Sequence, residues 1–294
     1  MAEVLPRLRR WALVTAVGLL TACASPQRVN GDFARAHGLH SALVAGDPFL
    51  HRIYFDLQGR RCRAVHVYLA GDGEPWLGRR YPSPDPTLAL PVALRLAALD
   101  EGPRLFLGRP CYEGLAGEDP HCTPWHWTHG RYSEAVVTSL ARVLERRLPH
   151  RPLVLIGHSG GGTLALLLAR RLPQVEGVVT LAGNLDPDAW TRHHGYLPLE
   201  GSLNPARLPP LPSSVAQFHW VGADDANVPP ELVRRALQPA RNPGAPADAP
   251  PRLVVLPGCG HSDCWVARWP ALLQTLDAEL GCTADARTRA TMPR

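Results

Sequence analysis

Lysine is absent from the 294-residue sequence, so all 31 of its basic side chains are arginine. Together with 31 prolines, this indicates a biased composition that says nothing about function. Basic residues do not cluster beyond the first ten positions and the net charge is only +5, which argues against a nucleic-acid partner. The sequence also lacks internal repeats and any apolar run long enough to span a bilayer. The chain is long enough for one domain with a full core.

The N-terminus has the pattern of an export signal. Arg7, Arg9 and Arg10 precede an apolar segment over residues 11–20, which is too short to span a bilayer as a mature helix. We therefore predict a cleaved signal peptide over residues 1–22.

This signal ends in Leu20-Thr21-Ala22-Cys23, which resembles the lipobox of bacterial lipoproteins. The resemblance implies that Cys23 is lipidated and anchors the protein to a membrane. Position 24 is Ala24 and not aspartate, and the absence of aspartate after the lipidated cysteine resembles lipoproteins that are sorted to the outer membrane. We therefore predict a location in the bacterial cell envelope, at the outer membrane and facing the periplasm. The alternative is an ordinary secretory signal in which Cys23 is an incidental thiol. Residues 23–48 have little periodicity and are predicted to be a tether, followed by the domain over residues 49–294.

Cysteine spacing argues against the common zinc motifs. The chain has seven cysteines but no C-x-x-C pair, so we predict neither a metal nor a cofactor. Lipidation of Cys23 leaves six, an even number that favours disulfides in an exported protein. Six cysteines allow about 15 pairings, and the sequence does not decide among them. Short spacing favours Cys259–Cys264 and Cys111–Cys122, and elimination would then pair Cys62 with Cys282.

The residues from Pro152 to Arg171 contain the clearest chemical motif. An apolar run over 153–156 predicts a buried strand, Gly157-His158-Ser159-Gly160-Gly161 breaks it, and a second apolar run from Thr163 predicts a buried helix. This succession is typical of a nucleophile elbow. The serine needs a tight, strained turn, so the residues two before and two after it must lack a Cβ. The helix N-terminus behind it favours developing negative charge. Ser159 is the predicted nucleophile.

Apolar runs alternate with helical patterns along the rest of the chain, which predicts an α/β fold with a mostly parallel central sheet and helices on both faces. A turn at 58–60 separates the first two strands. Residues 184–212 lack strong periodicity and follow the predicted site, where they could form a small cap. The predicted strands are 50–57, 64–70, 104–107, 153–156, 177–181, 215–221 and 253–256. The predicted helices, besides the one after Ser159, are 88–99, 132–148, 230–237 and 265–280.

A second chemical stretch runs from Val67 to Trp76, where a strand leads into a glycine-rich loop. Acyl transfer needs two backbone N–H groups aimed at the developing oxyanion. One is expected from Gly160, and the other from the loop after an earlier strand. We predict Asp72 as the second donor, through its backbone N–H and not its carboxylate. The alternative is that Gly71-Asp72-Gly73 is only a turn.

Two later loops supply a base and an acid. His261 follows the last predicted strand on a glycine-rich loop, where it would act as general base and then general acid. Asp225 and Asp224 both follow a late strand and qualify as the acid that orients this histidine. Asp186 is a third candidate, although Asp186-Pro187 is typical of a helix N-cap followed by proline.

The remaining histidines of interest form two groups. Those within residues 121–129 lack further ligands at the spacing of a metal site. We predict that this stretch packs against the helix that follows, with an aromatic wall beside the substrate as the alternative. His193 and His194 are predicted to lie on the surface.

Four motifs together resemble the α/β-hydrolase superfamily, from about residue 50 onward: G-x-S-x-G at 157–161, the glycine loop at 71–73, G-x-x-D-x-x-V-P at 222–229, and Gly260-His261. The resemblance implies that Ser159, Asp225 and His261 are catalytic. The glycine loop departs from the His-Gly form of many lipases and esterases, which leaves the second oxyanion donor open. The family implies a serine hydrolase, most simply a carboxylesterase, that acts on small-molecule or lipid esters through an acyl-enzyme. The alternative is a catalytically silent lipoprotein that uses the fold as a binding scaffold.

Overall fold

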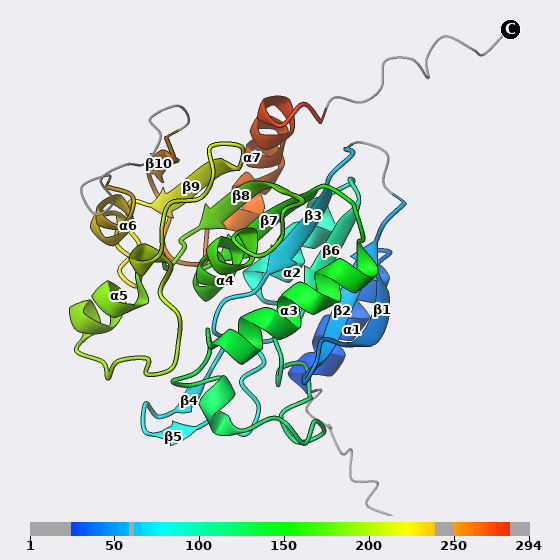
Figure 1. Ribbon diagram of the computed structural model, residues 1–294, viewed down its shortest axis with the longest axis vertical. Coiled ribbons are helices and arrows are strands. Elements are labelled where there is room, and N and C mark those ends of the chain that lie inside the picture. Colours follow the sequence, from blue (N-terminus) through cyan, green and yellow to red (C-terminus); the bar gives the residue numbers. More distant parts are fainter. Residues whose placement is uncertain (1–24, 59–61, 239–249, 283–294) are drawn as a thin grey trace, which may run out of the picture.

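The computed structural model describes residues 25–58, 62–238 and 250–282. Its central feature is an eight-stranded sheet with the order β1-β2-β6-β3-β7-β8-β9-β10 (Figure 1). β2 runs antiparallel to both neighbours, and the other adjacent pairs of this sheet are parallel. The strands are β1 (His40–Ala45), β2 (Leu50–Asp56), β3 (Val65–Leu69), β6 (Arg104–Leu107), β7 (Leu153–His158), β8 (Val175–Leu181), β9 (Ala216–Gly222) and β10 (Arg252–Leu256). A separate hairpin pairs β4 (Trp76–Leu77) with β5 (Tyr81–Pro82).

Helices cover both faces of the sheet (Figure 1). One core contains α3 and α4, and the other contains α1, α2 and α7. Alternation along β7 explains how one strand serves both cores, because Leu153 and Leu155 join the first while Val154 and Ile156 join the second. The helices are α1 (Pro26–Ala36), α2 (Val92–Leu99), α3 (Glu134–Arg147), α4 (Gly160–Ala169), α5 (Pro187–His194), α6 (Pro230–Ala236) and α7 (Trp265–Glu279). Short 3₁₀ helices lie at Pro124–His126 and Pro205–Arg207.

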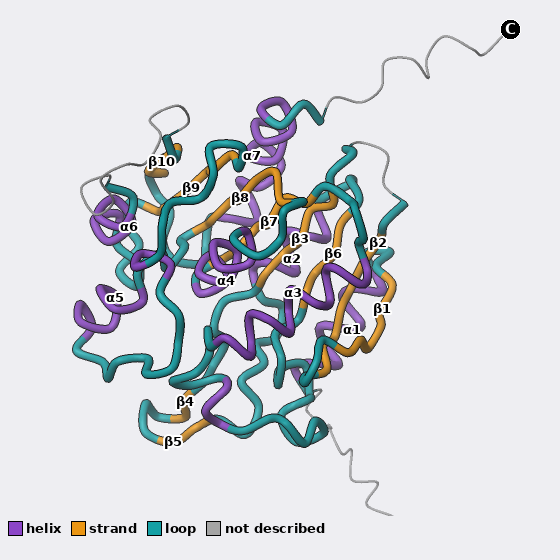
Figure 2. The backbone as a smooth tube through the Cα atoms, viewed as in Figure 1, coloured by secondary structure: helices purple, strands orange, loops and turns teal. Residues whose placement is uncertain are grey.

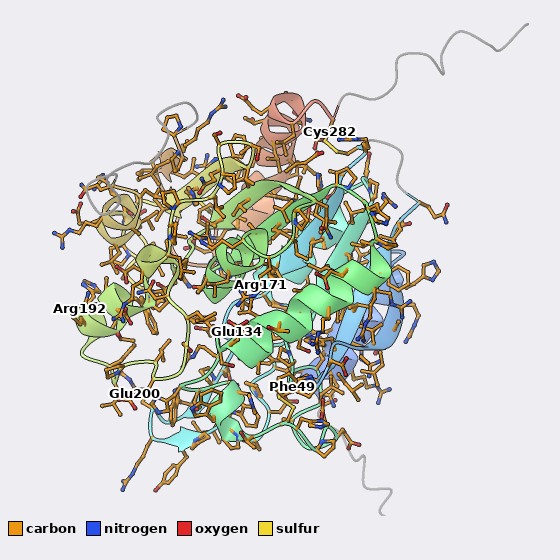
Figure 3. All side chains as sticks on the ribbon, viewed as in Figure 1. Phe49, Glu134, Arg171, Arg192, Glu200 and Cys282 are labelled. Carbon is orange, nitrogen blue, oxygen red and sulfur yellow. A yellow bond between two sulfur atoms is a disulfide. The ribbon has the colours of Figure 1, made fainter. Side chains whose placement is uncertain are left out.

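An ion pair at the surface also links the two helices of the first core, α3 and α4. Glu134 at the start of α3 forms an ion pair with Arg171, just beyond α4 (Figure 3). Both side chains keep contact with solvent, and an exposed pair of this kind contributes roughly 1 kcal/mol or less to stability.

The strands and helices predicted from periodicity are confirmed, with ends that differ by a few residues. The order of the strands in the sheet could not be predicted in the same way. β2 and β3 follow each other in the sequence, but β6 lies between them in the sheet. Periodicity shows where a strand runs and which faces are buried, but it does not show which strand becomes its neighbour.

The predicted tether over residues 23–48 needs correction, because most of it is part of the domain. α1 buries Asn30 and Ala34, and β1 pairs with β2 along its whole length. Both elements were missed in the sequence because each buries only a narrow row of residues, which leaves no clear apolar period. α1 is polar on most of its surface, and β1 is an edge strand in which Val44 is the buried residue.

Three disulfides join described residues: Cys62–Cys282, Cys111–Cys122 and Cys259–Cys264. This is the pairing that short spacing and elimination favoured. Cys23 and the predicted signal peptide lie outside the described residues. Among the helices that are described, none combines the length and the apolar character that crossing a membrane requires.

Candidate active site

Ser159 occupies the sharp turn between β7 and α4. Its φ of 55° and ψ of −122° are a strained conformation for a residue that carries a Cβ. A Cβ on Gly157 would lie 2.2 Å from the carbonyl oxygen of Gly161, and one on Gly161 would lie 2.1 Å from that of Leu69. Neither contact is sterically allowed, which explains why glycine is needed on both sides of the motif. The turn holds the serine at the carboxyl end of β7.

Three side chains from loops after β7, β9 and β10 meet at this turn. His261 Nε2 lies 3.0 Å from Ser159 Oγ, and His261 Nδ1 lies 2.9 Å from Asp225 Oδ2. A carboxylate only accepts, so Nδ1 carries the proton and Nε2 is left to accept from the serine hydroxyl. The Asp225 side chain is fully shielded from solvent, whereas that of His261 is 22% exposed. The arrangement can take a proton from the serine and stabilise the resulting imidazolium.

Of the three candidate acids, Asp225 is the one that contacts His261. Its Oδ1 also accepts from the backbone N–H of Asn227 at 2.9 Å and of Val228 at 2.8 Å, which fixes the carboxylate. Asp224 is exposed. Asp186 accepts from the backbone N–H of Ala189 at 3.1 Å, which confirms the predicted N-cap, here of α5.

The backbone of His261 is held by two donors. Its carbonyl oxygen accepts from His158 Nε2 at 2.8 Å and from Trp265 Nε1 at 2.9 Å. Burial, with a smaller contribution from the neighbouring His261, lowers the pKa of His158 to about 4. His158 is therefore neutral near pH 7 and adds no charge next to His261. The Cys259–Cys264 disulfide closes the same loop around His261.

Sequence reasoning missed Asn227, which connects the predicted catalytic residues to α5. Its Nδ2 lies 3.0 Å from His261 Nε2, beside the position of the serine hydroxyl. Its carbonyl oxygen accepts from Trp190 Nε1 at 3.0 Å and from His194 Nε2 at 2.8 Å. The prediction that His194 lies on the surface is corrected, since it is half-buried and lines the cavity over Ser159. Asn227 occupies a turn next to Asp225, and nothing in a turn's sequence indicates a contact with α5.

The loop after β3 approaches the serine from the other side. A Cβ on Gly71 would lie 3.1 Å from the Cβ of Ser159, and one on Gly160 would lie 2.2 Å from Asp72 Oδ1. The two predicted oxyanion donors, the N–H groups of Asp72 and Gly160, therefore belong to adjoining segments next to Ser159. Within the described residues, neither N–H donates a hydrogen bond to another protein group.

The carboxylate of Asp72 is the centre of an ion-pair network that sequence reasoning did not anticipate. It accepts from Arg109 Nη1 at 2.6 Å, from Arg131 Nη1 at 2.9 Å and from the Tyr132 hydroxyl at 2.7 Å. The two arginine side chains are only 1% and 4% exposed. Burial acts to raise the pKa of Asp72, but the charges of Arg131 and Arg109 outweigh it and hold the pKa at about 2. Asp72 is therefore ionised and matched by buried positive charge.

The same arginines and a tyrosine hold the backbone of this loop. Arg109 Nη1 also donates to the Gly71 carbonyl oxygen at 3.1 Å, and the Tyr112 hydroxyl donates to the Asp72 carbonyl oxygen at 2.8 Å. These residues carry no recognisable motif. Arg109 and Arg131 are two among 31 arginines, so composition could not single them out.

A cavity of about 960 Å³ opens over Ser159 and His261. The predicted cap over 184–212 contributes α5 and the loop after it, and this loop lies beside the β4–β5 hairpin (Figure 2). The predicted packing of residues 121–129 holds for Trp127, which is buried, whereas His129 lines the cavity next to Trp76. The apolar and aromatic lining includes Trp76, Leu88, Leu90, Val92, Tyr112, Trp190, Tyr196, Leu197 and Leu199.

One group of potential metal ligands lies among the described residues, remote from Ser159. It consists of Cys62, His66 and Cys282. The two cysteines are joined in a disulfide, so they present no thiolate, and His66 is hydrogen-bonded to Asp100 at 2.6 Å. These residues therefore do not form a ligand set for a metal ion.

Comparisons with known proteins agree with this architecture. The sequence profile of the family described as alpha/beta hydrolase fold matches residues 116–200, which include the serine turn. A structure of a putative hydrolase from Agrobacterium vitis S4 superposes with a TM-score of 0.55 at 17% identity, covering 81% of this chain and 98% of that one. The chain has the α/β-hydrolase fold. No curated protein matches the sequence significantly.

Two further structures of this fold are similar over most of their length. An α/β serine hydrolase without a lid from Xanthomonas campestris gives a TM-score of 0.50 at 16% identity, covering 86% of this chain and 97% of that one. A thermophilic esterase from the Planctomycetes species Thermogutta terrifontis gives a TM-score of 0.51 at 15% identity, covering 84% of this chain and 94% of that one. In an open α/β sheet, ligands bind outside the carboxyl ends of the strands. In this α/β-hydrolase fold, Ser159, Asp225 and His261 all follow such ends.

Proposed function

We propose that this protein is a serine hydrolase, most simply a carboxylesterase, that works through an acyl-enzyme on Ser159. One observation carries the proposal: an unbroken chain of hydrogen bonds runs from Ser159 Oγ through His261 to the buried Asp225 at the base of a large cavity. The strained backbone of Ser159 supports it, because such strain persists at sites where function requires it.

The acylation step follows from this geometry. Ser159 Oγ attacks the ester carbonyl carbon while His261 Nε2 takes the hydroxyl proton. Asp225 stabilises the imidazolium that forms. The carbonyl oxygen becomes an oxyanion that accepts from the N–H groups of Gly160 and Asp72. The bond to the alcohol oxygen then breaks, and the alcohol leaves with the proton that His261 returns.

Deacylation repeats these roles with water as the nucleophile. His261 takes a proton from the water as it attacks the acyl carbon, and it returns the proton to Ser159 Oγ as the acid is released. The paired charges of Asp72, Arg109 and Arg131 keep the oxyanion loop in place throughout. Because the carboxylate of Asp72 is matched by two arginines, it does not oppose the negative charge that develops nearby.

Fluorophosphonate labelling and hydrolysis of a p-nitrophenyl ester test the proposal together. The wild-type protein should be labelled at Ser159 and should turn over the ester. Ser159→Ala and His261→Ala should each remove nearly all turnover, and the double variant should be no worse, because the two residues act as a unit. A folded wild-type protein that is neither labelled nor active on any ester would contradict the proposal and favour a binding scaffold.

We also propose that the protein is anchored to a bacterial envelope membrane through a lipid on Cys23, at the outer membrane. The support is the sequence Leu20-Thr21-Ala22-Cys23 after a short apolar segment. Cys23→Ala should leave the protein uncleaved or should release it from the membrane fraction. Normal processing and membrane retention of this variant would contradict the lipid anchor, whatever the result of the esterase test.

A further inference from the structure

Three arginines line the cavity without a carboxylate partner. Arg79 and Arg80 lie in the turn of the β4–β5 hairpin, and Arg95 lies on α2. All three are exposed, and in the described parts of the chain none forms an ion pair with an acidic side chain. Arginine carries a permanent charge and five N–H donors, so these side chains keep most of their donors available.

The hairpin that carries two of them is attached to the loop after α5. Arg79 Nη2 donates to the Tyr196 hydroxyl at 3.2 Å, and its guanidinium lies 5.5 Å from the centre of the Tyr196 ring. The guanidinium of Arg80 lies 5.4 Å from the ring of Tyr81. Stacking of this kind holds a guanidinium in place without neutralising it. The positive charge at the cavity is therefore positioned by the surrounding residues.

The acidic residues of the cavity lining have other partners than these three arginines. Asp72 is already matched by Arg109 and Arg131. Burial raises the pKa of Glu113 to about 7, and its carboxyl oxygens accept from Tyr54 and Asn30.

Three other acids lie in the neighbouring segments. Asp85 follows the hairpin, does not line the cavity, and accepts from the backbone N–H of Thr87 at 2.9 Å. Glu74 precedes the hairpin, and Glu200 follows in the loop after α5, where Figure 3 labels it. Neither lines the cavity, and neither is paired with a described arginine. The lining thus contains three arginines that form no ion pair with an acidic side chain in the described parts of the chain.

The same lining offers a path for an apolar chain. Leu88, Leu90 and Val92 lead toward α2, and Leu197 and Leu199 lie on the side of the loop after α5. A volume of about 960 Å³ is at the upper end of the range for small-molecule sites, so it is larger than a short ester needs. The cavity suits a molecule with both an apolar part and an anionic group.

We propose that the substrate is an amphiphilic ester whose non-reacting part bears a phosphate or carboxylate, and that Arg79, Arg80 and Arg95 bind this anion while the ester reaches Ser159. The inference rests on the proposed hydrolase function and names its substrate class. Each fully formed hydrogen bond to a charged group typically tightens the dissociation constant by about 10–100-fold. Exposure and salt screening reduce this value at the rim of a cavity.

The test uses two p-nitrophenyl esters with acyl chains of equal length, one ending in a carboxylate and the other in its methyl ester. The measured quantity is the ratio of kcat/KM for the anionic ester over the neutral one. We expect the wild-type ratio to exceed one and to fall as sodium chloride is raised. In Arg80→Gln/Arg95→Gln the ratio should fall by about 10-fold or more. Arg79 is left unchanged because it also holds Tyr196.

The matched control is Arg147→Gln/Arg192→Gln, which removes the same charge from two exposed arginines that do not line the cavity. Arg192 lies on α5 near the site (Figure 3). The control should keep the wild-type ratio. A wild-type ratio of one, or an unchanged ratio in Arg80→Gln/Arg95→Gln, would overturn the inference and leave the hydrolase function intact. Failure to hydrolyse either ester, with no labelling of Ser159, would overturn the hydrolase function and this inference with it.

A second arm identifies the source of the anion. Fatty-acid release from vesicles of phosphatidylglycerol is compared with hydrolysis of the soluble anionic ester. If the wild type releases fatty acid from these vesicles and Arg80→Gln/Arg95→Gln releases less, the anion is the headgroup of a lipid. Turnover confined to the soluble ester, with the same dependence on these arginines, supports a small anionic ester. Equal fatty-acid release from phosphatidylglycerol and from diacylglycerol, which lacks the phosphate, would contradict recognition of the anion.

Discussion

The two loops that face Ser159 are held by different means. The His261 loop is held by neighbours in the sequence or in the serine motif: the Cys259–Cys264 disulfide, Trp265 and His158. The Asp72 loop is held by Arg109, Arg131 and Tyr132, which are 37 to 60 residues away. The backbone of His261 is held by a covalent loop closure and by neutral donors to its carbonyl oxygen, whereas the Asp72 loop depends on buried charges that must remain matched. A change on the histidine side should therefore act mainly on chemistry, and a change on the Asp72 side mainly on folding.

The largest expected effect separates two adjacent carboxylates on the histidine side. Asp225→Asn keeps the size of the side chain but removes the charge that stabilises the imidazolium, so kcat should fall by about 10⁴-fold. Asp224→Asn, whose side chain is exposed, is the control and should lose far less activity. The measurement is kcat/KM on a p-nitrophenyl ester, with the fold checked by circular dichroism. Comparable losses in the two variants, or a crippling loss in Asp186→Asn, would contradict the assignment.

A change at Asp72 should instead reduce stability. Asp72→Asn leaves Arg109 and Arg131 buried without a counter-charge, and breaking a buried ion pair in this way costs about 3–5 kcal/mol. Glu134→Gln removes one partner of the solvent-exposed pair with Arg171 and should cost less than about 1 kcal/mol. Urea unfolding of both variants gives the comparison. If Asp72→Asn were as stable as the wild type, the network would not be what holds this loop.

Glu113, on the same side as Asp72, should make stability depend on pH. Burial raises its pKa from 4.5 to about 7 in the folded protein, so between these values the folded state binds more protons than the unfolded state. Stability should be greatest below pH 4.5 as far as this residue is concerned, and should fall by up to about 3 kcal/mol as the pH rises through 7.

Glu113→Gln tests this dependence because it keeps the shape and most hydrogen bonds but does not titrate. The difference in unfolding free energy between the wild type and this variant should fall between pH 5 and pH 8. His51, His158 and His219, whose pKa values burial lowers to about 4, also make stability depend on pH, but they are present in both proteins and cancel in the difference. A difference between the two proteins that is the same at pH 5 and pH 8 would contradict the raised pKa of Glu113.

The smallest expected effect concerns Asn227, where α5 meets the histidine side. Asn227→Ala removes the contact with His261 Nε2 and a longer contact, 3.4 Å, between Asn227 Oδ1 and Trp190 Nε1. It keeps the backbone groups that bind Trp190, His194 and Asp225. Loss of one neutral hydrogen bond should lower kcat by about 3–10-fold with little change in KM. A rise in KM with unchanged kcat would instead indicate that the Asn227 side chain contacts the substrate.

The candidate site was predictable where its residues follow from local geometry. Ser159 could be named because a strained turn requires glycine at positions 157 and 161, and the structure contains those contacts. His261 and the candidate acids could be named because each follows a strand. The choice of Asp225 over Asp224 rested on a family resemblance, since the two are neighbours and only the folded chain shows which one reaches His261.

The fold was predictable in its elements but not in all their positions. Apolar runs located the main strands and helices because burial imposes a period on the sequence. The helix α1 and the strand β1 were missed, since a narrow buried stripe leaves too few apolar residues to form a pattern. The place of β6 between β2 and β3 could not be predicted either, because which strands become neighbours depends on the whole sheet and not on the sequence of any one strand.

By itself, the sequence determined the strand–turn–helix around Ser159, the alternation of strands and helices, and the short spacing that allows two of the three disulfides to close. All of these depend on residues close together in the chain, whose backbone geometry and burial leave a local pattern. Only the tertiary structure decided that Arg109 and Arg131 neutralise Asp72 and that Asn227 joins α5 to His261. It also decided that one cavity is lined by three arginines that have no acidic partner among the described residues. Charge pairing acts between side chains that meet only after folding, and it leaves no period in the sequence.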